Sequence, residues 1–220
     1  MNNNYTKFNH NPFETHKIVF ELISYGENIL DIGCASGYFA KELQQKDCKV
    51  WGIERDHKAI ETANKYCKKV FKIDLEKQFN LVNYFHFFDT VLILDVIEHL
   101  KNPEVLLSKV KNYITKNGKI IISTPNIAHL SIRINLLRGR FNYEQQGILD
   151  RTHIHFYTYE NLKSLLKKCN LQVQNTYYAN GLTKTPIISK ITDRLSFNSQ
   201  HKIVTYFPKL FAYQFIVLVK

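Results

Sequence analysis

The sequence predicts an α/β fold: one domain, residues 1–220, built on a doubly wound, mostly parallel sheet of seven strands. Short apolar runs alternate with stretches in which apolar residues recur at helical spacing, and this alternation favours parallel strands joined by helices. The run at residues 29–32 ends in a glycine turn that opens directly into a helical pattern. Several later strands end in an acid, and in an open parallel sheet such residues gather at one edge, where ligands bind.

Each element follows from local patterns. Residues 1–11 are polar and Asn-rich, and we expect them to be mobile. Pro12 opens a helical stripe that reaches Ser24, and Asp56 is placed to cap a later helix. The pair Asn117-Gly118 predicts a turn before the fifth strand. The expected strands cover residues 28–32, 48–53, 70–73, 88–94, 119–123, 171–178 and 210–219. The expected helices cover residues 12–24, 37–46, 56–67, 103–115, 127–137, 159–169 and 187–200.

The stretch from Asn28 to Phe39 organises the rest of the chain. Its turn has the spacing Asp31-x-Gly33-x-x-x-Gly37, and glycine there lets the backbone approach a ligand closely. About 20 residues later a second apolar run ends in Glu54, which is well placed to accept hydrogen bonds from a pair of ribose hydroxyls. The turn lacks the G-x-G-x-x-G pattern of dinucleotide sites, which argues against NAD.

Composition narrows the class of protein. Hydrophobic residues make up 45% of the chain, which favours a globular domain over a disordered one. Four cysteines without close pairing, no apolar run long enough to span a bilayer and no signal-peptide pattern at the start predict a cytoplasmic protein. A peripheral contact with a membrane stays open. The net charge of +11 favours acidic partners such as nucleic acid or anionic lipid, although scattered lysines equally fit a solvated surface.

The turn Gly33-Cys34-Ala-Ser-Gly37 resembles the first motif of class I S-adenosylmethionine (SAM)-dependent methyltransferases, of the bacterial ubiquinone/menaquinone-like (type 11/23-like) superfamily. The resemblance implies a Rossmann-like methyltransferase sheet whose last strand inserts antiparallel, with SAM as the cofactor. The resemblance also implies roles for these residues. The glycines leave room for the methionine part of SAM, Glu54 accepts hydrogen bonds from the ribose, and Asp74 accepts one from the adenine amino group. The cofactor-binding residues that it implies are Asp31, Gly33, Cys34, Gly37, Glu54, Asp74, Leu75 and Asp95.

The hexapeptide Asp95-Val-Ile-Glu98-His99-Leu100 resembles the segment after strand four in many small-molecule methyltransferases. Two carboxylates and an imidazole suit a divalent ion, and two families resembling this one carry an acid-x-x-Glu-His metal motif here. A metal held by Asp95, Glu98, His99 and His153 is therefore one interpretation. The other is metal-free, with Glu98 and His99 at a helix start, where a carboxylate is favourable.

A later segment, Gly147 to Thr158, resembles a G-x-x-D-R-T-H-x-x-F-x-T signature of bacterial methyltransferases. Asp150, Arg151 and His153 could order a lid over the cofactor, or His153 or His155 could act as general base, because histidine takes a proton near neutral pH. A polar cluster that only fixes the loop is the alternative. We expect residues 126–157 and 180–208 to be the substrate or lid segments.

These features predict a methyltransferase that acts on a hydroxyl oxygen, with His153, His99 and Asp95 as the catalytic candidates. The acceptor would be a small molecule, a glycan or a lipid-linked compound. An RNA 2′-O-methyltransferase and a SAM-binding protein without catalysis are the alternatives. The oligomeric state and the acceptor itself do not follow from the residues.

Overall fold

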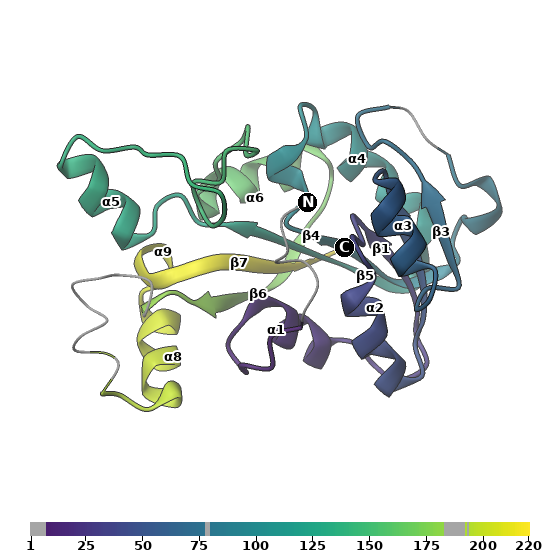
Figure 1. The fold of residues 1–220 in the computed structure, drawn as a ribbon, viewed down its shortest axis with the longest axis horizontal. Helices are drawn as coiled ribbons and strands as arrows, with labels where there is room; N and C mark the ends of the chain where they lie inside the picture. The colour runs from purple at the N-terminus through teal and green to yellow at the C-terminus, as the bar shows by residue number, and fades with distance from the viewer. Residues whose placement is uncertain (1–7, 78–79, 183–191, 193) are drawn as a thin grey trace.

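A computed structural model describes residues 8–77, 80–182, 192 and 194–220. The predicted α/β fold is confirmed: a seven-stranded sheet has the order β3-β2-β1-β4-β5-β7-β6 (Figure 1). All neighbours from β3 to β5 pair in parallel, and β7 runs antiparallel to both β5 and β6, as predicted for the last strand. The strands are β1 (Asn28–Ile32), β2 (Lys49–Glu54), β3 (Lys69–Lys72), β4 (Phe88–Leu94), β5 (Ile114–Pro125), β6 (Val173–Asn180) and β7 (Ala212–Val219).

Helices cover both faces of the sheet. They are α1 (Thr15–Leu22), α2 (Tyr38–Leu43), α3 (His57–Ala63), α4 (Pro103–Val110), α5 (Leu130–Leu137), α6 (Tyr159–Lys168), α8 (Phe197–Tyr206) and α9 (Pro208–Phe211). Short 3-10 turns cover Gln44–Lys46, Val82–Tyr84, Ile97–His99 and Lys111–Tyr113. Among the described residues, no helix combines the length and the apolar character that crossing a bilayer requires.

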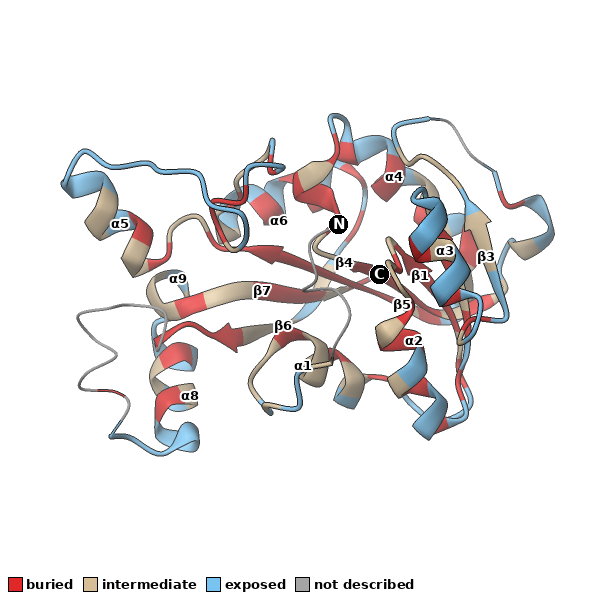
Figure 2. Ribbon diagram, viewed as in Figure 1, coloured by how far each residue is buried: buried red, intermediate tan, exposed pale blue. Residues whose placement is uncertain are grey.

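Two apolar cores, one on each face, hold the layers together. Successive residues of a strand point to opposite faces, so Ile29 packs with α1, α2 and α3 while Leu30 and Ile32 pack with α4 and α6. The strands in the middle of the sheet are buried along most of their length (Figure 2). The sheet therefore gives a rigid support to whatever follows its carboxyl ends.

Several element boundaries differ from the prediction. Asn117 and Gly118 do not form a turn before the fifth strand but lie inside β5, where the pairing register with β4 jumps between Phe88 and Thr90. A Cβ on Gly118 would lie 3.1 Å from two carbonyl oxygens of β4, so this glycine serves a close backbone approach. The helix expected over 103–115 ends at Val110.

At the C-terminal side, the helix expected over residues 187–200 is found at Phe197–Tyr206, with the Ser196 hydroxyl accepting a hydrogen bond from the Ser199 N–H as its cap. Residues 187–191 and 193 of that expectation lie outside the described residues, as do residues 183–186 of the expected substrate or lid segment 180–208 and residues 1–7 of the expected mobile start. The strand expected from residue 210 begins at Ala212 because Pro208 starts a short helix.

Candidate functional site

The strand order reverses between β1 and β4, and a cavity, called the main cavity below, opens at the carboxyl ends of the strands there. It has a volume of about 560 Å³, and a switch point of this kind is where open α/β sheets bind ligands. Its walls combine carboxylates, histidines and apolar side chains. The lining residues are His16, Asp31, Gly33, Cys34, Ala35, Tyr38, Phe39, Ile53, Glu54, Arg55, Ile73, Asp74, Leu75, Glu76, Leu94, Asp95, Val96, His99, Leu100, Gln145, Asp150, Arg151 and Thr152.

The two motif glycines have different surroundings. Gly33 lines the cavity with a φ of 79°, and a Cβ there would lie 2.8 Å from Val96 Cγ2. Gly37, also left-handed with a φ of 73°, precedes α2 and is not a lining residue; a Cβ there would lie 2.8 Å from the Cα of Ala63. Gly33 therefore shapes the ligand cavity, whereas Gly37 allows α3 to pack closely against the turn.

Glu54 ends β2 and is held by three backbone N–H groups. Its Oε1 accepts hydrogen bonds from Arg55 N at 2.7 Å and Asp56 N at 2.9 Å, and its Oε2 accepts one from Ala35 N at 3.1 Å. A carboxylate offers about four lone-pair sites, so acceptor capacity remains on the cavity side. The bond to Ala35 also joins Glu54 to the glycine turn.

Asp31 lies at the end of β1, buried in the cavity wall. Burial, and next the negative charge of Glu54, raise its pKa to about 7. Since burial penalises the charged form, a cationic group of a ligand would favour ionised Asp31. Asp74 and Leu75, after β3, line the same cavity, and the Asp74 carboxylate accepts a hydrogen bond from the Glu76 N–H.

Asp95 follows β4 with a φ of 54°, a conformation that non-glycine residues rarely adopt. Its carboxylate accepts hydrogen bonds from the Ser123 hydroxyl at 2.9 Å and from Gln214 Nε2 at 2.9 and 3.0 Å. The strained residue is thus fixed from β5 and β7. The motif search identified Asp95, but it missed Ser123 and Gln214, because strand pairing alone brings them to this point.

His16 is a third residue of the site that no sequence motif indicated. It comes from α1 and lines the cavity beside Tyr38, with 2.6 Å between its Nε2 and the tyrosine hydroxyl. Burial lowers the pKa of His16, opposed by the negative charge of Asp95. A polar residue at helical spacing with Val19 and Ile23 was the available signal, although that pattern alone does not point to a ligand.

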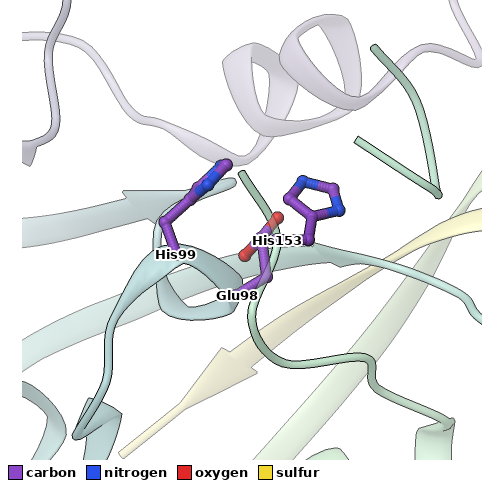
Figure 3. A group of neighbouring side chains, drawn as sticks. All are labelled: Glu98, His99 and His153. Carbon is purple, nitrogen blue, oxygen red and sulfur yellow. The ribbon is translucent and has the colours of Figure 1, made fainter. Parts of the chain in front are cut away.

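Glu98, His99 and His153 form a compact cluster next to this cavity, with one nitrogen or oxygen atom of each lying within 4.8 Å of the others. Figure 3 shows the Glu98 carboxylate between the two imidazole rings. The 3-10 turn Ile97–His99 supplies two of the three residues. The loop carrying His153 is joined to this turn because Ile154 N and His155 N both donate to the Glu98 carbonyl oxygen, at 2.9 and 3.1 Å.

Hydrogen bonds orient both imidazoles of the cluster. The Nδ1 of His99 lies 3.2 Å from the Thr152 carbonyl oxygen, and that of His153 lies 3.1 Å from the Ile148 carbonyl oxygen. A carbonyl only accepts, so each Nδ1 is the donor in these contacts, and in the neutral form of either ring the Nε2 carries the free lone pair. Glu98 Oε2 accepts a hydrogen bond from Thr124, but the buried Oε1 has no partner among the described residues.

The cluster is electrostatically unusual. Burial, and next the charge of Asp95, raise the pKa of Glu98 well above its ordinary value. Burial, and next the proximity of His153, lower the pKa of His99, which therefore stays neutral at physiological pH. Three groups with free acceptor capacity meet at one point, which suits either proton transfer or a bound cation.

The structure separates the four residues proposed as metal ligands. It brings Glu98, His99 and His153 together and holds the Asp95 carboxylate in its own hydrogen bonds with Ser123 and Gln214. The other candidate base, His155, points elsewhere, with its Nε2 at 3.3 Å from the Lys101 carbonyl oxygen.

His153 also lines a second, open hollow of about 610 Å³, called the outer hollow below. It is lined by Tyr143, Arg151, His153, Ile154 and Phe156. Arg151 lines this hollow and the main cavity alike. The histidine cluster therefore sits between a cavity suited to a cofactor and a hollow open to a second molecule.

The chain is similar in sequence to known methyltransferases. The sequence model of a methyltransferase domain matches residues 10–176, which is more than half of the chain. The ubiquinone biosynthesis O-methyltransferase of Rickettsia felis is 31% identical over 123 residues, covering 53% of this chain and 50% of that protein. The pavine N-methyltransferase of Thalictrum flavum subsp. glaucum is 32% identical over 105 residues, covering 46% of this chain and 30% of that protein.

The fold also matches solved structures. A SAM-dependent methyltransferase from Archaeoglobus fulgidus superposes with a TM-score of 0.63 at 19% identity, covering 94% of each chain. This likeness shows the fold. The chain spans about half the length or less of the curated relatives described above.

Proposed function

Because the chain belongs to the class I SAM-dependent methyltransferases, we propose that it methylates a hydroxyl oxygen of a small-molecule, glycan or lipid-linked acceptor. The observation that carries this proposal is the Glu98–His99–His153 cluster beside the main cavity, where both imidazoles use Nδ1 for hydrogen bonds to carbonyl oxygens and leave Nε2 for a ligand. An oxygen nucleophile must lose a proton as it attacks, whereas an amine does not need a strong base. The name of the Rickettsia O-methyltransferase agrees with an oxygen acceptor.

The main cavity fits the cofactor of this family. SAM carries a positively charged sulfonium and amino group, and the cavity presents Asp31, whose pKa is raised by burial and by the charge of Glu54 and which forms no ion pair among the described residues. In this proposal Asp31 takes the amino group, Glu54 the ribose hydroxyls and Asp74 the adenine amino group. SAM supplies the methyl group to a nucleophile aligned behind it, so the residues mainly orient both molecules and exclude water.

The proton of the acceptor goes to the histidine cluster. His99 lines the cavity and is neutral because burial lowers its pKa, so it is ready to accept a proton. His153 lies at 4.7 Å from His99 between ring centroids and faces the outer hollow. An acceptor that enters through this hollow would meet His153 first, with its hydroxyl directed toward the main cavity.

A divalent cation also fits this cluster. Glu98 Oε1 is buried without a partner, and the Nδ1–H donors of both histidines are already engaged, which is the arrangement that orients histidines toward a metal. Glu98, His99 and His153 would hold such an ion. When bound, it lowers the pKa of a coordinated hydroxyl.

The test is a methyl-transfer assay with isotopically labelled SAM and catechol as the probe hydroxyl acceptor, followed by product identification. We expect a methyl ether, and a rate reduced about 10²–10⁴-fold in His153→Ala. His155→Ala is the matched control, because His155 lies two residues away and contacts the Lys101 carbonyl oxygen. Transfer to amines but to no hydroxyl compound, or equal losses in the two variants, would contradict the proposal.

A further inference from the structure

The tip of α5 and the loop after it expose an unusual run of apolar side chains. Residues 136–146 are all exposed, and Leu137 has 89% of its surface accessible. We call the "α5 surface" the exposed apolar and basic residues Arg133, Leu136, Leu137, Arg138, Arg140, Phe141 and Tyr143. α5 lies at one end of the long axis of the molecule, at the opposite end from α3 (Figure 1). Solvated apolar groups gathered this closely indicate a contact surface.

The α5 surface is strongly basic. No Asp or Glu occurs from His129 through Tyr143, whereas Arg133, Arg138 and Arg140 lie within that range. All three arginines are exposed, and none of the ion pairs found among the described residues involves them. Apolar side chains interspersed with arginines that form no such ion pair complement a surface that is negatively charged outside and apolar just beneath.

We propose that the α5 surface docks on a membrane containing anionic phospholipids. The leucine and aromatic side chains would enter the boundary between headgroups and acyl chains, as amphipathic surface helices do. The arginines would contact lipid phosphates, because their guanidinium groups pair with phosphate while their stems lie along apolar surface. Each basic residue near an anionic leaflet strengthens such binding, and salt weakens it.

The base of this surface is firmly attached to the domain. Ile132 of α5 packs with Ile148 and Leu149 in a small apolar core of its own. Glu144 N donates to the Leu149 carbonyl oxygen at 2.8 Å, which closes the loop on itself. Binding of the exposed tip to a membrane would therefore hold the whole domain there, because the base of the α5 surface stays packed in the domain.

The position of the surface connects it with the site. Tyr143 lines the outer hollow, and the chain then runs directly to Gln145 and Asp150–Thr152 of the main cavity. A docked bilayer would lie beside the mouth through which an acceptor reaches His153. This link favours a lipid-linked or amphipathic acceptor and rests on the proposed methyltransferase function, whereas docking itself does not.

The test is co-sedimentation of the full chain with sucrose-loaded vesicles of phosphatidylcholine, with and without 30 mol% (about one lipid in three) phosphatidylglycerol. We expect binding to the anionic vesicles, little binding to pure phosphatidylcholine and loss of binding at high salt. Arg133→Gln/Arg138→Gln/Arg140→Gln should lower the partition coefficient about a hundredfold. Leu136→Ser/Leu137→Ser should lower it at least tenfold.

Matched controls separate docking from general charge attraction. Lys58→Gln/Lys65→Gln/Lys68→Gln removes three exposed charges from the region of α3, and Val82→Ser/Val105→Ser removes exposed apolar groups elsewhere. Both controls should keep nearly all binding. The inference is overturned if the lysine and arginine variants lose binding equally, or if the leucine variant binds like the parent.

Other occupants of the surface give distinct results. Self-association without vesicle binding, abolished by Leu136→Ser/Leu137→Ser in sedimentation velocity, would assign the surface to a second copy and overturn membrane docking. RNA binding lost in the arginine variant, again without vesicle binding, would also overturn it. Calorimetry with S-adenosylhomocysteine is measured in parallel, so that failure of docking and failure of the methyltransferase proposal are distinguished.

Discussion

Replacing Asp31 with Asn should stabilise the protein while weakening its hold on SAM. Asn keeps the shape of the side chain and removes the charge. The pKa of Asp31 is about 7 against an ordinary 3.8, and each unit of difference corresponds to about 1.4 kcal/mol. Ionised Asp31 therefore lowers the free energy of unfolding by up to about 4 kcal/mol above pH 7. Allowing for the buried amide, Asp31→Asn should gain about 2–4 kcal/mol at pH 8.

The sign of the pH dependence follows from proton binding. Below about pH 4 both the folded and the unfolded chain hold the Asp31 proton, so the variant gains nothing there. Between about pH 4 and pH 7 the folded chain keeps a proton that the unfolded chain has released, and wild-type stability falls as the pH rises. The gain in Asp31→Asn should grow across this window. The raised pKa of Glu98 is common to both proteins and cancels in the comparison.

Urea unfolding of both proteins at pH 4, 6 and 8 measures this difference. A melting temperature higher by roughly 4–16 °C at pH 8 should accompany it. Asp47→Asn is the matched control, because Asp47 is exposed and its φ of 52° suits Asn. Affinity for S-adenosylhomocysteine should fall about tenfold or more in Asp31→Asn. An Asp31→Asn variant that is less stable than the parent at pH 8 would refute the reasoning. So would a difference in free energy of unfolding that does not change with pH.

Three further outcomes follow from the site. Glu54→Ala should weaken S-adenosylhomocysteine binding at least tenfold, for a loss of roughly 1.5–3 kcal/mol by calorimetry; unchanged affinity would remove Glu54 from the site. If a divalent ion occupies the cluster, chelator should abolish turnover and Mg²⁺ or Mn²⁺ should restore it, whereas chelator-resistant turnover would leave His99 and His153 as bases. Amide exchange at residues 138–146 should be fast in the free protein and slower with cofactor and acceptor bound; slow exchange from the outset would exclude a lid.

The glycine turn and the acids at strand ends could be predicted because their signals are local. Gly33 and Glu54 each stand next to the strand that positions them, and the wall of the main cavity contains both. His16 and Gln214 could not be found in this way. They lie near opposite ends of the chain, and only α1 and the antiparallel insertion of β7 bring them to Asp31 and Asp95.

The lid prediction illustrates the same limit. Within the expected substrate or lid segment 126–157, residues 138–152 contain Gly139 and Gly147, with Arg138 and Arg140 between apolar groups, and this pattern favours a single loop that closes over the substrate. The structure divides the segment: residues 138–146 are exposed, whereas Ile148 and Leu149 are buried with Ile132. Packing of α5 against this distant pair decides where mobility can begin, and no spacing in the sequence encodes it.

The pKa shifts of three buried acids differ in direction according to whether the protein itself stabilises the charged form. Burial would raise the pKa of Glu27, but hydrogen bonds from Lys119, Thr90 and the Ser24 N–H lower it overall, so this acid is stabilised within the protein. Asp31 and Glu98 are also buried, and burial raises the pKa of both. Within the described part of the chain neither of these two acids forms an ion pair, and both lie at the carboxyl edge of the sheet. Such local instability persists where a ligand compensates for it, so we propose that Asp31 receives a positively charged group of the cofactor and that Glu98 receives a proton or a cation.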